Sequence, residues 1–206
     1  MQLNKKITNY GYFRDTLSGP NIFLRRPHAK DWKEWAELRS DSQSFLRPWE
    51  PAWTPGALSR SEFRQRIRQQ RRLIDSKQAY PFFIFRKKDN CILGGITISN
   101  IQRGVSKSGT IGYWIGEKHS RHGYMKEGLS CVLSFLFSEL ELHRVQAFCM
   151  TKNISSKNLL ENLGFRLEGE IRDCLYINDR WEDHLLYNIL STDWSLMLKK
   201  GSANFL

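Results

Sequence analysis

A short basic loop, "HSRHGYMKEG" at residues 119–128, holds the residue types best suited to chemistry in this chain. It follows the apolar run "IGYWIG" and leads into "MKEGLSCVLSFLFSEL", whose apolar residues recur at spacings of three and four. These patterns predict a strand, a loop and then a helix of residues 125–140. The first amides of a helix lack partners within the helix and carry partial positive charge, so this junction could bind a phosphate.

A glycine stands just before the expected helix. Gly123 would let the backbone approach an anion closely, and Arg121, His122 and Lys126 would add positive charge. Glycine is also common in ordinary connections between a strand and a helix. The loop alone therefore leaves both interpretations open.

The elements that must position this loop alternate between the periods of strands and helices. Strands are expected at residues 22–26, 79–88, 91–101, 109–116, 143–150, 166–177 and 180–190, and helices at 29–41, 59–78, 125–140 and 153–165. This order predicts one α/β (α+β) domain, a single mixed sheet flanked by helices, at residues 21–195. Residues 1–20 are expected to be a loosely held arm and residues 196–206 a tail.

Local signals mark the ends of several elements. Ser59 or Ser61 can cap the helix at 59–78, and Asn153 can cap the helix at 153–165. Gly164 stands where a left-handed residue would end that second helix. Residues 45–56 contain three prolines and two tryptophans and are expected to form a loop without regular periodicity.

Composition narrows the classes of partner. The net charge of +11 over 206 residues favours an anionic partner: nucleic acid, a phosphorylated cofactor or an acidic surface. The four cysteines lack CxxC spacing and favour buried reduced thiols, and the five histidines lack metal-ligand spacing, so no metal is expected. No apolar run has the length of a membrane helix, which predicts a cytoplasmic protein without membrane association.

Two motifs in this chain resemble those of the GCN5-related N-acetyltransferases. Residues 120–125 fall on the six positions of that family's pattern Gln/Arg-x-x-Gly-x-Gly/Ala. Its second signature, Asn-x-x-Ser followed by Leu-Gly-Phe, matches Asn153, Ser156 and residues 163–165. The resemblance covers about residues 22–194 and implies the acetyltransferase fold and acetyl-CoA as co-substrate.

The resemblance also implies which residues bind the co-substrate. Its pyrophosphate would lie over the backbone amides of Arg121, His122, Gly123, Tyr124 and Met125. The first motif position is Ser120 where the family usually has glutamine or arginine, and Arg121 stands where glycine is frequent. Backbone donors survive such changes, so binding is still expected.

Within that superfamily the chain is similar to the ribosomal-protein-alanine N-acetyltransferases, the Rim group. The supporting segments are "FLRPWEP" at 45–51, "LEGEIRD" at 167–173 and "YINDRWEDH" at 176–184. This similarity implies acetyl transfer to the N-terminal α-amine of a ribosomal protein, the alanine of protein S5 above all. The acceptor could be free or within a ribosomal particle.

The catalytic residues follow from the same similarity. Ser156 matches a serine proposed as general acid in Rim relatives, although a purely structural role in the first turn of its helix is an equal alternative. Glu50 is a candidate base or amine anchor. The glutamate that many relatives carry near Thr110 is absent, and the position of a frequent tyrosine acid is Leu160.

The remaining assignments concern binding. An amide near Trp114 or Ile115 is expected to stabilise the oxyanion, and Asn153 is expected to position both the cofactor and its helix. The loop at 45–56 would form one wall of the acceptor site, or simply a lid over the core. The arginine-rich helix at 59–78 could contact ribosomal RNA or an acidic acceptor, or could be a solvated face.

Two other functions remain open. The chain could acetylate a small amine, although its cationic surface disfavours polycationic substrates. It could also be a non-catalytic RNA- or ribosome-binding protein on an acetyltransferase scaffold. Binding of acetyl-CoA would separate the second alternative from both enzymes.

Overall fold

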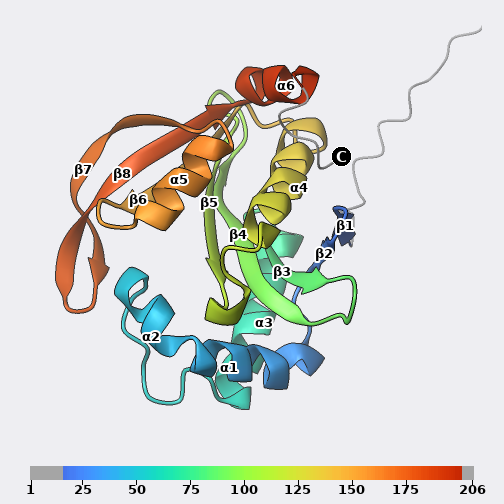
Figure 1. Ribbon diagram of the computed structural model, residues 1–206, viewed down its shortest axis with the longest axis vertical. Helices are drawn as coiled ribbons and strands as arrows, with labels where there is room; N and C mark the ends of the chain where they lie inside the picture. Colours follow the sequence, from blue (N-terminus) through green and yellow to red (C-terminus); the bar gives the residue numbers. More distant parts are fainter. Residues whose placement is uncertain (1–15, 201–206) are drawn as a thin grey trace, which may run out of the picture.

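A computed structural model describes residues 16–200 of the chain (Figure 1). Residues 1–15 of the expected arm and 201–206 of the expected tail lie outside the described part. The strands are β1 (Thr16–Ser18), β2 (Ile22–Arg25), β3 (Tyr80–Arg86), β4 (Ile92–Gln102), β5 (Ser108–Ile115), β6 (Arg144–Met150), β7 (Arg166–Ile177) and β8 (Arg180–Leu190). The helices are α1 (Trp32–Asp41), α2 (Gln43–Leu46), α3 (Arg60–Asp75), α4 (Tyr124–Ser138), α5 (Ile154–Asn162) and α6 (Ser191–Lys199), with short 3-10 helices η1 (Ala29–Asp31), η2 (Arg47–Trp49) and η3 (Glu117–His119).

Within the described residues the strands form one sheet in the order β1-β2-β3-β4-β5-β6-β8-β7. Every neighbouring pair is antiparallel except β5 and β6, which run parallel. The predicted mixed sheet flanked by helices is confirmed. In Figure 1, the β7–β8 hairpin projects from one edge of the sheet, and β1 lies at the other edge.

Helices cover both faces of the central strands. Side chains alternate between the two faces of a strand, so neighbouring residues of β3 enter different cores. Phe82 and Ile84 of β3 enter a core with the buried residues of α4 and α5. Phe83 and Phe85 enter a second core with α1 and α3. The near-continuous apolar run in β3 follows from this burial on both sides.

The local signals at element ends hold in the structure. The Ser59 side chain accepts from the amide of Glu62, which makes Ser59 the cap of α3. Asn153 caps α5, and Gly164 has φ +81 immediately after that helix. These features depend on a few consecutive residues, and short-range hydrogen bonds determine them.

Three segments differ from the sequence-based expectation. A further strand, β1, pairs with β2, and a further helix, α6, follows β8 directly. The expected loop at 45–56 begins inside the single turn α2 and contains the single turn η2. β1, α2 and η2 have only three or four residues, too few to show a periodic pattern, whereas α6 has nine.

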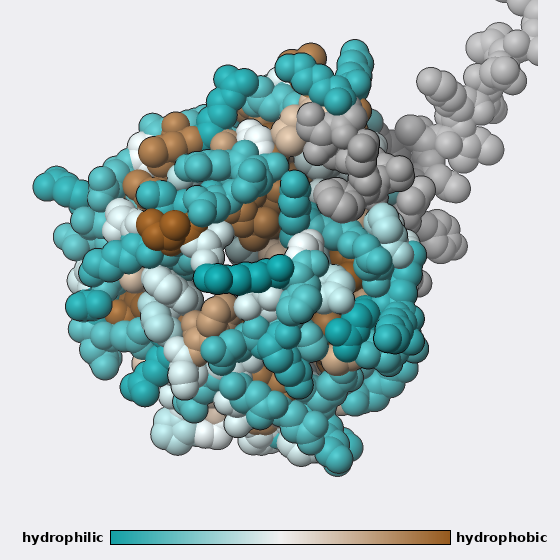
Figure 2. Space-filling model, viewed as in Figure 1, coloured by the Kyte–Doolittle hydropathy of each residue, from teal (hydrophilic) through white to brown (hydrophobic). Residues whose placement is uncertain are grey.

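The surface seen from the side of α4 and α5 is mainly hydrophilic. Figure 2 shows apolar residues there in separate patches, without one broad apolar area on this face. None of the helices in the described residues is long and apolar enough to cross a bilayer.

Candidate active site

The two central strands β5 and β6 separate part-way along their length (Figure 1). Their parallel pairing covers Ser108–Thr110 against Arg144–Gln146, although β5 continues to Ile115 and β6 to Met150. The second halves of the strands therefore have an unpaired side toward each other. An open strand side of this kind presents backbone N–H and C=O groups to a ligand.

The pairing of β5 with β4 decides which amides face that gap. The amide of Gly116 donates to the carbonyl of Leu93 beyond the end of β4. Because N–H directions alternate along a strand, Trp114 also faces β4, whereas Tyr113 and Ile115 direct their amides toward β6. Of the two amides named from the sequence, that of Ile115 points into the gap and that of Trp114 points toward β4.

The loop after β5 curls back to begin α4. Arg121 and Gly123 both have positive φ, 61 and 81. A helix cannot continue through such residues, so α4 begins at Tyr124, after the loop. Gly123 is the N-cap and offers no side-chain acceptor, which leaves the first amides of α4 available to an anion.

The surroundings of Gly123 refine the reason for a glycine there. A Cβ added at Gly123 would meet no atom within 4 Å. The position therefore needs glycine for its positive φ and for the open space beside the helix terminus, and no clash within the protein is involved. The exposed His122 ring stacks on Tyr124 with centroids 5.8 Å apart and helps to shape this loop.

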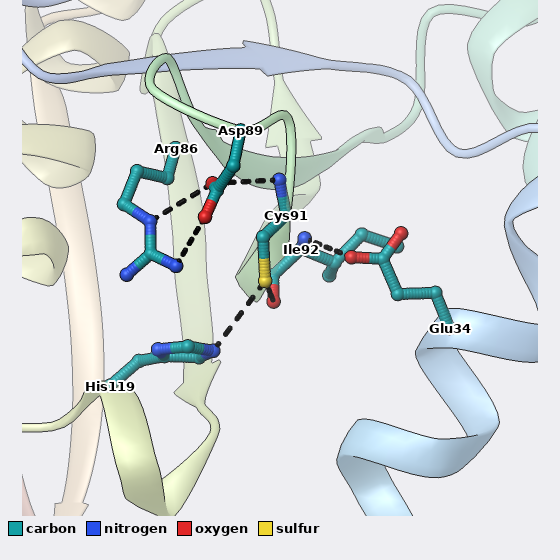
Figure 3. A network of polar contacts seen from close by, with 6 residues as sticks. All are labelled: Glu34, Arg86, Asp89, Cys91, Ile92 and His119. Atoms are coloured by element: carbon teal, nitrogen blue, oxygen red, sulfur yellow. Dashed lines mark hydrogen bonds and ion pairs between the residues drawn. The ribbon is translucent and has the colours of Figure 1, made fainter.

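A polar network fixes the start of the loop to the rest of the fold (Figure 3). His119, in η3, is buried, and its Nε2 lies 3.8 Å from Sγ of Cys91 at the β3–β4 turn. In that turn, Asp89 accepts two bonds from Arg86 and a third from the amide of Cys91. At the start of β4, the amide of Ile92 donates to the carboxylate of Glu34, which lies on α1.

The electrostatics of this network favour a neutral imidazole. Burial, assisted by the charges of Lys118 and Arg86, lowers the pKa of His119. Burial raises the pKa of the Cys91 thiol, so the pair at this contact is uncharged near neutral pH. The loop is thus held by a partly buried contact between neutral groups.

Ser156 lies in the first turn of α5, where Asn153 Oδ1 accepts from its amide at 3.0 Å. Its hydroxyl Oγ is 2.6 Å from the hydroxyl of Tyr113 on β5. The hydroxyls of Ser156 and Tyr113 therefore meet beside the strand segment that β6 leaves unpaired. Asn153 acts here as a helix cap, which is part of the role expected for it.

Glu50 is held by an arginine. Arg39 of α1 donates to both carboxylate oxygens of Glu50, at 2.9 and 2.5 Å, and Trp53 Nε1 donates to Oε2 at 3.0 Å. The guanidinium of Arg39 also lies over the rings of Trp53 and Trp114, 4.5 and 4.9 Å from their centroids. This cluster attaches the loop at 45–56 to the end of β5, and both carboxylate oxygens are already engaged.

The same loop approaches the tip of the β7–β8 hairpin. Asn178 Nδ2 donates to the carbonyl of Arg47 at 2.7 Å. Trp49 is partly exposed on the loop, and Tyr176 and Trp181 are exposed on the hairpin with ring centroids 5.6 Å apart. Aromatic side chains therefore lie on both segments.

Sequence reasoning missed Tyr113 and Arg39. Tyr113 lies on the same face of β5 as Ile111 and Ile115, the face that packs toward α4. Its position in the sequence therefore resembles that of an ordinary core residue. Arg39 stands in an amphipathic helix rich in charge and carries no motif that predicts its burial. Only the partners of these residues, on distant segments, reveal a role.

Comparisons with known proteins agree with this geometry. The model of the acetyltransferase (GNAT) domain matches residues 21–166. The chain belongs to the GNAT acetyltransferase family.

Two curated relatives extend the match over most of the chain. The [ribosomal protein uS5]-alanine N-acetyltransferase of Escherichia coli (strain K12) is 30% identical over 179 residues, 87% of this chain and 92% of the relative. The probable N-acetyltransferase YjcK of Bacillus subtilis (strain 168) is 31% identical over 177 residues, 86% of this chain and 98% of the relative. Family membership makes the protein an acetyl-CoA-dependent acetyltransferase.

A solved structure shows the same fold. Mycobacterium smegmatis RimJ, in complex with CoA-disulfide, superposes with a TM-score of 0.84 at 26% identity, covering 91% of this chain and 95% of that one.

In residues 16–200 of the present protein, no three His, Cys, Asp or Glu side chains gather as metal ligands would. All four cysteines are free thiols. Cys131 and Cys149 are buried, whereas Cys91 and Cys174 are half-buried, so the expected burial holds for two of the four.

Proposed function

We propose that this protein transfers acetyl from acetyl-CoA to the N-terminal α-amine of a ribosomal protein, with the alanine of S5 as the leading acceptor. The observation that carries the proposal is the gap between β5 and β6, toward which the amides of Tyr113 and Ile115 point. The similarity to an S5-alanine acetyltransferase over 87% of the chain supports the choice of acceptor. A ribosomal acceptor would place the reaction in the cytoplasm.

In the proposed complex, the loop and the strand bind different parts of acetyl-CoA. The amides from Arg121 to Met125 would hold the pyrophosphate at the positive end of α4. The acetyl group would lie at the gap, where the amide of Ile115 donates to the thioester oxygen. The fit is chemical as well as spatial, because the first amides of α4 donate to no capping side chain and remain available to an anion.

Reaction then requires a neutral amine beside the thioester. The amine attacks the carbonyl carbon, an oxyanion forms, and the C–S bond breaks as the amide forms. An α-amine has a pKa of about 8, so a useful fraction is neutral at physiological pH without a strong base. Positioning and oxyanion stabilisation can therefore supply most of the rate enhancement.

The state of Glu50 bears on the acceptor class. Arg39 engages both of its carboxylate oxygens, so Glu50 is poorly placed to hold the ammonium of a polyamine. The neighbouring segments carry Trp49, Tyr176 and Trp181, which suit an uncharged peptide segment. These features favour a protein N-terminus over a polycationic small molecule, and they favour a loop-positioning role for Glu50.

The test is direct acetylation by the purified protein. Acetyl-CoA is mixed with S5 or its N-terminal peptide, and intact-mass spectrometry follows addition of one acetyl group to the first residue. Peptides that begin with alanine or serine, and spermidine, are compared at equal concentration. Preferential transfer to the alanine peptide supports the proposal. Acetyl-CoA binding without transfer to any amine would instead favour a non-catalytic protein.

The arginines of α3 supply a possible second contact with the acceptor. Exposed side chains on this helix include those of Arg60, Arg64, Arg68, Arg71 and Arg72. We propose that this face attracts ribosomal RNA or an acidic part of the acceptor. Such long-range attraction weakens as salt shortens the Debye length to about 3 Å at 1 M.

We define the α3 variant as the protein with Arg64, Arg68 and Arg71 changed to glutamine. It should slow acetylation of the ribosomal particle or of full-length S5 and leave a short uncharged peptide unaffected. The matched control changes Lys88, Arg103 and Lys107 to glutamine, which removes the same charge elsewhere on the surface. Equal effects of the two triple variants would show that only net charge matters.

A further inference from the structure

The hydroxyl of Ser156 is oriented differently from those of three other helical serines in this protein. Ser130, Ser138 and Ser195 each donate to the carbonyl four residues earlier in the chain, the usual bond for a serine within a helix. Ser156 lies in the first turn of α5, and its hydroxyl instead meets that of Tyr113 at 2.6 Å. Tyr113 of β5 is thus one side-chain partner of this hydroxyl, and the Cys149 thiol of β6 is a second.

We infer that Tyr113 is a positioning residue that donates its phenol proton to Ser156 and thereby leaves the serine proton directed at the gap between β5 and β6. A phenol is the stronger acid of the two hydroxyls, so it is the better donor. A serine oxygen that accepts one bond can still donate its own proton. The inference rests on the proposed acetyl transfer and adds a second residue to its proton chemistry.

The surroundings keep Tyr113 in the donor state. Burial raises the pKa of Tyr113 above its usual value, so the phenol remains protonated across the neutral range. The backbone at both ends is fixed: Tyr113 pairs with Ile96 of β4, and the amide of Ser156 is held by Asn153. The two hydroxyls thus meet without further ordering of the chain, which is the condition for preorganised catalysis.

The proton balance of the reaction gives this arrangement a purpose. As the C–N bond forms and the C–S bond breaks, the nitrogen must lose one proton and the sulfur must gain one. Ser156 would give its proton to the departing sulfur and regain one from solvent water, while the proton from nitrogen passes to solvent. Tyr113 keeps its own proton throughout and holds the serine in the orientation that allows this transfer.

The experiment compares Tyr113→Phe, Ser156→Ala and the double variant with the alanine peptide as acceptor. Tyr113→Phe removes a single oxygen, and kcat should fall by up to about a hundredfold, the low end of the range for acid catalysis. The dissociation constant of acetyl-CoA and KM for the peptide should stay within about twofold. Because the two residues act as a unit, the double variant should be no slower than Ser156→Ala alone.

Tyr187→Phe is the matched control for a merely structural role. The Tyr187 hydroxyl also joins the sheet to α5, by donating to Glu161 Oε1 at 2.7 Å. Its loss should lower thermal stability without lowering kcat. If Tyr113→Phe retains wild-type kcat, or if the effects of Tyr113→Phe and Ser156→Ala multiply in the double variant, the inference is overturned. Absence of transfer by the wild-type protein would overturn the proposed function together with it.

Discussion

Substitution of Glu50 by glutamine tests whether this carboxylate is a base or part of a structural cluster. In the structure Glu50 accepts from Arg39 through both oxygens and from Trp53 through one of them. The Arg39 side chain is 10% exposed, and its Nε has no hydrogen-bond partner among the described residues. Glu50 is therefore the acceptor that compensates a largely buried guanidinium.

The expected cost follows from these contacts. Glutamine keeps the shape of Glu50 but removes its charge and turns an N–H₂ group toward Arg39 or Trp53. A hydrogen bond to a charged group contributes about 1.5–3 kcal/mol. The Glu50 side chain is 21% exposed, so solvent screens part of the interaction, and we expect a loss of about 2 kcal/mol, within that range. For a protein of this size the corresponding fall in Tm is about 4–8 °C.

The assay measures thermal unfolding and steady-state kinetics on the same preparation. Because the cluster attaches the loop at 45–56 to the end of β5, KM for the peptide should rise more than kcat falls. The dissociation constant of acetyl-CoA should be unchanged. Asp89→Asn is the comparison for thermal stability. It breaks another two-bond pair, with Arg86, in an exposed turn, where an ion pair contributes little to the free energy of unfolding.

One result would refute this reasoning. A Glu50→Gln protein with an unchanged Tm and a kcat lowered by two orders of magnitude or more would make Glu50 the catalytic base. Arg39→Gln would then affect kcat only indirectly. Under the positioning role, Arg39→Gln and Glu50→Gln should show similar kinetic defects, and the double variant should be less impaired than the product of the two.

Two further predictions concern the loop before α4. Gly123→Val should weaken acetyl-CoA binding by at least about tenfold in calorimetry, through loss of the open space and of the left-handed backbone. Gly104→Val is the control, because Gly104 has φ +59 and equally open surroundings, and it should leave binding unchanged. Equal losses of affinity in the two variants would refute the placement of the pyrophosphate. Burial lowers the pKa of His119, so protonation costs more in the folded than in the unfolded state. The contribution of His119 to stability is therefore fully present above pH 6.5 and is lost as pH falls below that value. His119→Gln should flatten the acid side of a Tm-against-pH curve, with a residual slope from His28, whose pKa is also lowered by burial; an unaltered slope would show that His119 protonates without cost.

The sequence alone determined the features that depend on neighbouring residues. The apolar spacing of Leu129, Leu133 and Leu136 predicted α4, and all three are fully buried. The caps at Ser59 and Asn153 and the left-handed Gly164 were also predictable. Each of these signals lies within one or two turns of chain, where hydrogen bonding and periodicity act locally. The acetyltransferase fold and the reaction class were implied by the resemblance to a known family that two motifs carry.

Only the tertiary structure decided how the site is assembled. Tyr113 and Ser156 are 43 positions apart, and their hydroxyls meet beside the part of β5 that lies beyond the pairing with β6. Arg39 and Glu50 meet because α1 and the following loop pack against β5, and this contact changes Glu50 from a free carboxylate to an engaged one. Such contacts depend on strand register and on the packing of distant segments. Residue types and spacing along the chain carry no direct record of either, so these roles appear only when the chain is folded.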